Sequence, residues 1–322
     1  PWLPLTRELA AKLTEGENNP PPSQFKESVM SIFSSVEELL AECGKRKAPL
    51  WRLVMDYSAH DSGIGPQKSW DEMSRRLCAM RDAAASYEPE QRSRSGLSGG
   101  DGAKMERYYR SGRSIGGDFT GEILTAALRM GECNACMHRI VAAPTAGACG
   151  VMPAVLLPYA EKFGCPDERL VEALFVAAGF GAVIATRASI SGAEAGCQAE
   201  IGSAAAMSAA ALVYLHGGSP RQMAQAVAIA LKNMMGLVCD PVAGLVEVPC
   251  VKRNVAGAMN ALSAAELALA GIESRIPTDE VIDAMRAVGE ALPSALRETG
   301  RGGVAASPTA VAFRENFFGK QA

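Results

Sequence analysis

Two apolar runs in the second half of the chain are built largely from small residues. Residues 174–185 lie between Glu172 and Arg187, and residues 201–215 consist mainly of alanine and serine around a few larger side chains. The first is too short to span a bilayer, and the second has the composition of a closely packed helix. No sustained two-residue alternation, hairpin signature or internal repeat accompanies them. The sequence therefore predicts an all-α fold, a multi-helix domain whose loops carry function.

Helix-capping patterns predict where several helices begin. Residues 219–222 (Ser-Pro-Arg-Gln) combine an N-cap serine, a proline at the first helical position and a capping glutamine, and Gly236 suits the helix end. Ser34 with Glu37 three residues later predicts a capping box. Thr278 is expected to cap a further amphipathic helix.

The charge and cysteine content limit the function classes. Residues 1–28 include a polar, proline-rich stretch and are expected to be a linker or N-terminal extension, ahead of one helical domain at residues 29–322. The net charge of −3, without a basic stripe, gives no support for a nucleic-acid partner, and no membrane partner is expected. Nine cysteines without a signal-like segment predict reduced thiols in the cytoplasm.

Three of the cysteines lie in loop-like surroundings. Cys197 follows a glycine, Cys239 precedes Asp-Pro, and Cys250 follows a proline. Backbone of this kind can turn around an inorganic core, as in iron-sulfur ligation. The alternative is three structural thiols, because free cysteine is among the most buried residue types.

Three segments offer groups that could bind an anionic substrate. The stretches at 95–104 and 142–153 are rich in glycine and small residues and precede helices, so their backbone amides could cradle a carboxylate. The residues after Cys250 offer charge-assisted donors. A flexible linker and close helix packing are the alternatives for the first two stretches. The candidate substrate-binding residues are Ser95, Ser98, Gly99, Gly100, Asp101, Thr145, Ala146, Gly147, Lys252, Arg253 and Asn254.

A C-x-x-C pair and two histidines are rival candidates. Cys133 and Cys136 have a common metal or redox spacing, but no second pair completes a zinc site, so helix packing is favoured. His60 and His216 titrate near neutrality and are candidate bases. His216 also fits the C-terminus of a helix, and His60 flanks a turn at residues 61–66.

At these loops the sequence resembles the α chain, or α domain, of iron-sulfur-dependent L-serine dehydratases. The resemblance runs from about Ile32 to Phe318 and rests on four motifs, Ser95-Gly-Leu-Ser-Gly-Gly-Asp101, Ala142-Ala-Pro-Thr-Ala-Gly147, Ala188-Ser-Ile-Ser-Gly-Ala-Glu-Ala-Gly-Cys-Gln-Ala-Glu200 and Cys239-Asp-Pro-Val-Ala-Gly-Leu-Val-Glu-Val-Pro-Cys-Val-Lys-Arg-Asn254. It implies an all-helical domain and a [4Fe-4S] cluster bound through Cys197, Cys239 and Cys250. It also implies that the loops at 95–101 and 144–147 help to hold the substrate.

The chain departs from the family pattern at three places. The Ser-Ser-Ser-His-Thr type motif of the family's β domain is absent, so we expect a separate β subunit or β domain as partner, in a homo-oligomer. Some members place a C-terminal cysteine on the fourth iron, whereas this chain ends in Lys-Gln-Ala, so water, substrate or another chain is expected there. Thr186-Arg187 stands where a pair of asparagines is expected, which leaves a changed substrate preference open.

The resemblance implies deamination of L-serine to pyruvate and ammonia without pyridoxal phosphate. Three cysteines leave one iron open to polarise the β-hydroxyl as a Lewis acid. The base that removes the α-proton is expected to be Lys104, His60 or a residue of the β partner. A cysteine desulfidase, a threonine dehydratase, a non-catalytic iron-sulfur sensor subunit and a structural scaffold remain the alternatives.

Overall fold

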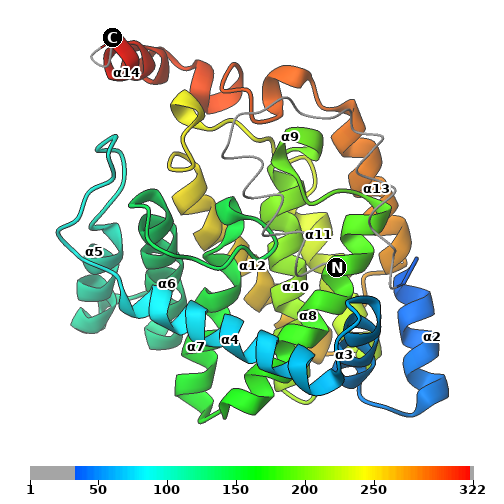
Figure 1. Ribbon diagram of the computed structural model, residues 1–322. Coiled ribbons are helices and arrows are strands. Elements are labelled where there is room, and N and C mark those ends of the chain that lie inside the picture. The colour runs from blue at the N-terminus through cyan, green and yellow to red at the C-terminus, as the bar shows by residue number, and fades with distance from the viewer. Residues whose placement is uncertain (1–32, 320–322) are drawn as a thin grey trace.

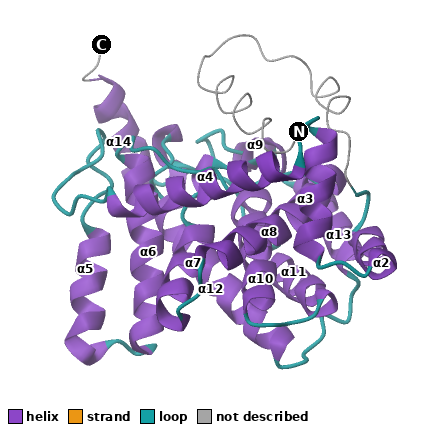
Figure 2. Cartoon of the chain, turned by 60° about the horizontal axis from the view of Figure 1, so that its bottom comes forward, coloured by secondary structure: helices purple, strands orange, loops and turns teal. Residues whose placement is uncertain are grey.

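The computed structural model describes residues 33–319, and every regular element in that range is a helix. The one β-like feature there is an isolated bridge between Cys239 and Arg297. For the described part of the chain, Figure 2 shows helices and connecting loops and no strand. The all-α prediction is confirmed. The linker predicted at residues 1–28 lies outside the described residues.

Helix α10 (Ser203–Leu215) lies at the centre of the fold (Figure 1). It packs against α8 (Asp167–Arg187), α11 (Pro220–Met234) and α12 (Cys250–Leu269). Its alanines without exposed surface are Ala204, Ala205, Ala206, Ala209, Ala210 and Ala211. At Gly257 of α12, an added Cβ would lie 2.8 Å from a methyl group of Ile201, in the π-helical turn that leads into α10. Small residues thus let these helices pack closely, as the sequence predicts.

The remaining helices surround this core. Helices α3 and α4 pack on α8, while α6 contacts α5, α7 and α12. Helix α13 packs on α11 and on the segment that carries Cys197, and α14 packs near the Cys239–Cys250 segment. Their bounds are α2 (Val36–Arg46), α3 (Leu50–Asp61), α4 (Pro66–Ala85), α5 (Asp101–Tyr108), α6 (Gly117–Ala135), α7 (Val151–Phe163), α9 (Gly192–Ala195), α13 (Thr278–Ala291) and α14 (Pro308–Gly319).

Helix α8 is long and apolar enough to cross a membrane by length and composition alone, but 78% of its apolar window is buried inside the fold. Its largest side chains, Phe175 and Phe180, have no exposed surface. The apolar character of α8 is therefore explained by the core that it helps to form.

Of the two predicted capping boxes, the structure confirms the one at Ser219 and contradicts the one at Ser34. Ser219 accepts a hydrogen bond from the amide of Gln222, and the Gln222 side chain accepts one from the Ser219 amide, so this capping box is confirmed. The box predicted at Ser34 is wrong by one residue. Ser35 is the N-cap of α2 and accepts from the Glu38 amide at 2.9 Å. The Glu38 carboxylate, one residue after the predicted Glu37, accepts from the Ser34 amide at 2.8 Å.

The predicted cap at Thr278 is also wrong. Thr278 is the first residue of α13, after the N-cap Pro277, and its hydroxyl donates to the carbonyl of Ala224 on α11. A threonine can stabilise either a helix start or a contact between helices, and here the buried carbonyl is its partner. The sequence pattern alone could not distinguish the two.

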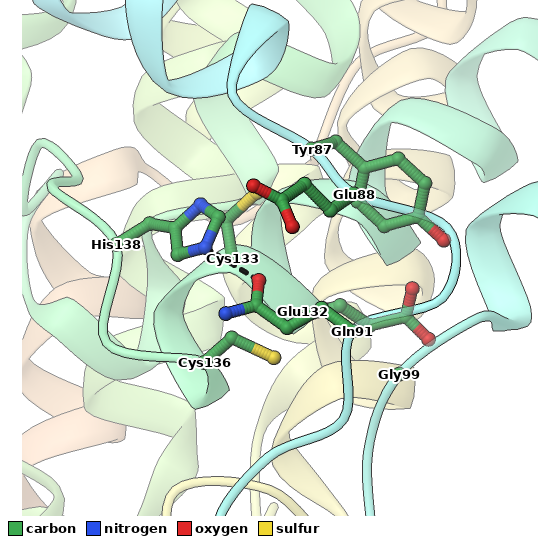
Figure 3. A pocket seen from close by; sticks show the side chains of 8 residues that line it. All are labelled: Tyr87, Glu88, Gln91, Gly99, Glu132, Cys133, Cys136 and His138. Carbon is green, nitrogen blue, oxygen red and sulfur yellow. Dashed lines mark hydrogen bonds between the residues drawn. The ribbon is translucent and has the colours of Figure 1, made fainter.

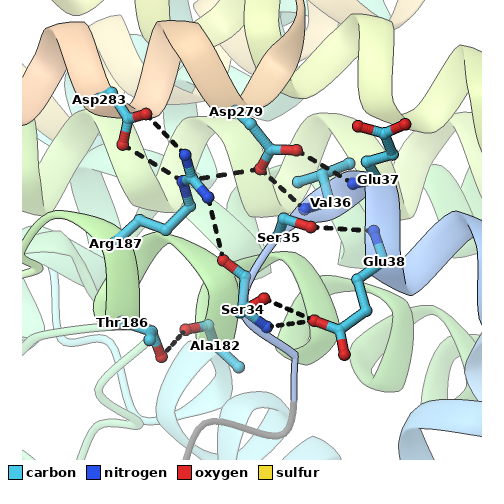
Figure 4. A network of polar contacts seen from close by, with 10 residues as sticks. All are labelled: Ser34, Ser35, Val36, Glu37, Glu38, Ala182, Thr186, Arg187, Asp279 and Asp283. Carbon is cyan, nitrogen blue, oxygen red and sulfur yellow. Dashed lines mark hydrogen bonds and ion pairs between the residues drawn. The ribbon is translucent and has the colours of Figure 1, made fainter.

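Arg187, the last residue of α8, joins three elements (Figure 4). Its guanidinium contacts both carboxylate oxygens of Asp283 on α13 at 3.2 and 2.6 Å, and it donates to the Ser34 carbonyl at 3.2 Å. Asp279 accepts from the amides of Val36 and Glu37 at the start of α2. The network fixes the end of α8, where the segment leading to Cys197 begins.

Candidate functional site

The three cysteines singled out by sequence come from three segments. Cys197 immediately precedes a short π-helical turn, Cys239 follows α11, and Cys250 is the first residue of α12. The side chains of Cys197 and Cys239 are buried and Cys250 is partly buried. The backbone of Cys239 is held by two hydrogen bonds, from its own amide to Leu296 and from the Glu298 amide to its carbonyl.

The thiols of these cysteines influence one another. A hydrogen bond with Cys197 raises the pKa of the Cys239 thiol, and burial and the nearby Glu200 carboxylate raise it further. Burial raises the pKa of Cys250 to about 12, and the charge of Cys197 adds to the effect. Burial and nearby negative charge thus disfavour the thiolate forms of Cys239 and Cys250.

Glu200 lies beside this group and was not assigned a role from sequence. Its Oε2 atom is 3.9 Å from the sulfur of Cys239. Burial, followed by the charge of Glu298, raises the pKa of Glu200 to about 7, although the Thr145 hydroxyl opposes the shift. At Gly192 an added Cβ would lie 2.5 Å from this carboxylate and 3.0 Å from the Cys239 sulfur. The one-turn spacing from Cys197 was the available sequence signal.

Arg253 links the segments that carry Cys239 and Cys250. Its guanidinium lies 2.8 Å from the buried Asp240 carboxylate and donates to the Val238 carbonyl at 2.9 Å. Burial alone would lower the pKa of Arg253, yet the neighbouring charges of Cys197 and Asp240 raise it on balance. The cation predicted to contact substrate or cluster therefore lies close to the cysteines while it holds Asp240.

Asn254 ties the second predicted substrate loop to α12. Its side-chain amide donates to the Gly147 carbonyl at 2.7 Å, and its oxygen accepts from the Gly150 amide at 2.8 Å. Gly147 in turn lies against Glu200, since an added Cβ would be 3.4 Å from the carboxylate. The Ala146 carbonyl accepts from Asn134. The loop with Thr145 thus lies beside the cysteine group.

The first predicted substrate loop is attached to the Cys239–Cys250 segment through Glu247. This buried carboxylate accepts from the Ser93 hydroxyl at 2.6 Å and from the Ser95 hydroxyl at 2.8 Å. The Ser98 amide donates to the Ser93 hydroxyl at 3.2 Å. Glu247 belongs to the long cysteine motif, but its partner lies 154 positions earlier in the sequence, so spacing gave no signal for the pair.

Two glycines shape the end of this loop. Gly99 and Gly100 have φ values of 126° and 79°, in the left-handed region that side chains disfavour. They lead into α5, whose first amides, Asp101 and Gly102, donate to the buried Glu132 carboxylate at 2.7 and 3.2 Å. The helix N-terminus predicted to receive a substrate carboxylate thus already holds a carboxylate of this chain.

The lysines on the site's flank are paired with Asp101. Lys252 contacts one carboxylate oxygen at 2.5 Å and Lys104 contacts the other at 2.8 Å. The Lys104 side chain, followed by Lys252, holds the pKa of Asp101 below its usual value. The Lys104 side chain is 67% exposed. The candidate base Lys104 therefore lies at the surface in an ion pair.

The two histidine candidates lie on other elements. His60 is exposed near the end of α3, a helix that packs on α4 and α8. His216 is the C-cap of α10, as expected for a histidine at a helix end, and contacts the Tyr159 hydroxyl through Nδ1 at 3.3 Å. Neither makes a described contact with the three cysteines.

The C-x-x-C pair borders a different depression, in which Gly99 also takes part (Figure 3). Its lining residues are Tyr87, Glu88, Gln91, Gly99, Glu132, Cys133, Cys136 and His138. His138 bridges the Gln91 side chain at 2.6 Å and the Ser86 hydroxyl at 3.0 Å. Burial raises the pKa of both Cys133 and Cys136, which leaves them as unreactive thiols. These features support the packing interpretation.

Cys197, Cys239 and Cys250 offer three thiol donors, the ligand type that iron-sulfur clusters use. Within residues 33–319 no group of His, Cys, Asp and Glu side chains converges tightly enough to hold one metal ion. A cluster instead bonds each thiolate to a separate iron and so spreads its ligands around a core. Coordination to a metal deprotonates a thiol, so it would lower the raised pKa values of Cys239 and Cys250.

Comparison with known proteins identifies the family. The family model described as "Serine dehydratase alpha chain" matches residues 28–305. The "Probable L-serine dehydratase, alpha chain" of Bacillus subtilis is 46% identical over 288 residues, which cover 89% of this chain and 96% of the relative. The "Probable L-serine dehydratase, alpha chain" of Latilactobacillus sakei is 52% identical over 203 residues, which cover 63% of this chain and 97% of the relative.

A third relative also matches most of the chain. The "L-serine dehydratase, alpha chain" of Peptoniphilus asaccharolyticus is 40% identical over 291 residues, which cover 89% of this chain and 98% of the relative. The four motifs of the site all lie inside the matched range of the family model. The chain therefore belongs to the serine dehydratase alpha chain family.

Proposed function

We propose that this chain is the α chain of an iron-sulfur-dependent L-serine dehydratase, a lyase that converts L-serine to pyruvate and ammonia without pyridoxal phosphate. The names of the relatives support the reaction. The observation that carries the proposal is the contact between Cys197 and Cys239, with Cys250 close enough for the charge of Cys197 to raise its pKa.

These three cysteines would hold the cluster. When bound through three thiolates, a [4Fe-4S] cluster supplies an open iron that acts as a Lewis acid on the β-hydroxyl of serine. The Arg253 guanidinium, partly buried beside the thiols, would offset their negative charge. Asn254 and Glu247 would hold the two predicted substrate loops against the segment that carries Cys250.

The overall reaction removes the α-proton and the β-hydroxyl of serine. The resulting aminoacrylate tautomerises to an imine, which water hydrolyses to pyruvate and ammonia. Lys104 is ion-paired at the surface and His60 is exposed on α3. We therefore assign the base to a β subunit or β domain, a partner that the α-chain names of the relatives support. We also propose a homo-oligomeric assembly and a cytoplasmic location.

Pyruvate release by the anaerobically purified complex with its β partner tests this function. We expect release of pyruvate from L-serine, which Cys239→Ala abolishes and Cys43→Ala preserves, because Cys43 is a buried thiol of α2 that bonds to the Ala48 carbonyl. Parallel assays with L-cysteine and L-threonine measure sulfide and 2-oxobutyrate. Cluster-replete complex that releases none of these products would contradict a dehydratase and favour a sensor subunit.

A further inference from the structure

Glu247 is a buried carboxylate without a cationic partner in the part of the chain that the structure describes. Its residue is 6% exposed, and no Lys, Arg or His side chain within residues 33–319 forms a salt bridge with it. Buried carboxylates are costly unless a positive group compensates their charge. Two nearby acids show the usual solutions, since Asp240 pairs with Arg253 and Glu132 accepts two amides at the start of α5.

Hydroxyl groups are the side-chain partners of Glu247. Ser93 donates to Oε2 at 2.6 Å, and Ser95 donates to Oε1 at 2.8 Å. A serine hydroxyl has one hydrogen and two lone pairs, and an ionised carboxylate can only accept. The two hydroxyl oxygens also lie 3.1 Å from each other. When both hydroxyls donate to Glu247, each oxygen acts toward any other group as an acceptor. The Leu97 amide already donates to Ser95 in this way, at 3.0 Å.

This acceptor group lies next to the predicted substrate loops and the cysteine segment. Ser95 belongs to the first loop and is partly exposed. Val246, the neighbour of Glu247, contacts the second loop, because a Cβ added at Gly147 would lie 3.6 Å from its methyl group. The Glu247 carbonyl accepts from the Val251 amide in the first turn of α12, which begins at Cys250. The group therefore lies between both loops and the third cysteine.

We propose that Ser95, backed by the carboxylate of Glu247, receives the α-ammonium group of the amino-acid substrate. This assignment rests on the proposed function and deepens it. It differs from the expectation from sequence, in which this loop cradles the substrate carboxylate. The ammonium supplies the cation that Glu247 lacks, and its hydrogens meet the lone pair that Ser95 retains. The site then selects 2-amino acids over 2-hydroxy acids of the same shape.

The test compares binding of L-alanine and L-lactate to the cluster-replete complex with its β partner, by calorimetric titration. The two ligands differ at the α-substituent, and neither carries a β-leaving group, so binding is measured whether or not the protein deaminates serine. A separate serine assay reports on the proposed function. The variants are Glu247→Gln, which removes the charge at constant shape, and Ser95→Ala, which removes the contact group and leaves the carboxylate.

We expect the unmodified protein to prefer alanine and each variant to lose this preference by roughly 10-fold or more, the usual worth of a charge-assisted hydrogen bond. Lactate affinity should stay within a few-fold. The control Glu172→Gln removes a carboxylate of α8 that pairs with Arg169 and Tyr214, and it should keep the preference. An unmodified protein that does not prefer alanine would overturn the proposal, as would variants that weaken alanine and lactate equally.

Discussion

The Arg253 guanidinium lies 2.8 Å from the carboxylate of Asp240, and this ion pair joins the two segments that carry Cys239 and Cys250. The side chains are 16% and 2% exposed, so solvent screens the pair weakly. Asp240 also accepts the Val304 amide at 2.6 Å, which ties the C-terminal segment to the same point. The pair therefore supports the geometry of the cysteine group from beside it.

Arg253→Gln should destabilise the fold strongly. It leaves the Asp240 carboxylate buried without its cation, and removing one partner of a buried pair costs about 3 kcal/mol or more. Urea unfolding of the cluster-free variant measures this loss. Arg253→Lys keeps the charge but not the planar donor geometry, so it should retain part of the stability. An Arg253→Gln variant as stable as the unmodified protein would show that the pair contributes little.

Gly192→Ala should disrupt the cysteine group with little effect elsewhere. The added methyl would lie 2.5 Å from the Glu200 carboxylate and 3.0 Å from the Cys239 sulfur, which forces one of them to move. We expect a large loss of bound iron in anaerobically purified protein. The control Gly44→Ala places a methyl in α2 with no atom within 4 Å, and it should keep the cluster. Equal iron content in both variants would contradict this account of the site.

The Asp101 ion pairs predict a pH-dependent contribution to stability. Lys104, followed by Lys252, holds the pKa of Asp101 below its usual value of 3.8. A carboxyl group with a lowered pKa in the fold stabilises it above the unfolded-state pKa, and this contribution is lost as the pH falls through the folded-state pKa. The group is partly exposed, so the contribution should stay below about 1 kcal/mol.

The measurement compares the cluster-free unmodified protein with Asp101→Asn by urea unfolding at several pH values. Near neutral pH the variant should be less stable, and the difference should shrink as the pH is lowered below 3.8. A difference that stays constant over this range would mean that the ion pairs do not stabilise the fold.

The sequence predicted the parts of the fold that depend on local pattern. The alanine-rich run of α10 and the capping box at Ser219 involve neighbouring residues, and both predictions are confirmed. Thr278 was misjudged because its hydroxyl bonds to Ala224 on another helix. Local pattern could not reveal that contact.

The candidate site shows the same limit. The motifs drew attention to all three cysteines and to both loops, but the acids that organise them were missed. Glu132 fills the start of α5 from another helix, and Glu247 meets Ser93 across 154 positions. Such carboxylates acquire their roles only when the chain folds, because their partners are distant in sequence.

The iron and acid-labile sulfide content of anaerobically purified protein tests the central claim most directly. We expect about four irons and four sulfides per chain, and a marked loss of both in Cys197→Ala, Cys239→Ala and Cys250→Ala. Cys43→Ala should retain them. A protein without iron after anaerobic isolation with its partner, or a Cys239→Ala variant with a complete cluster and full activity, would contradict the three-cysteine site.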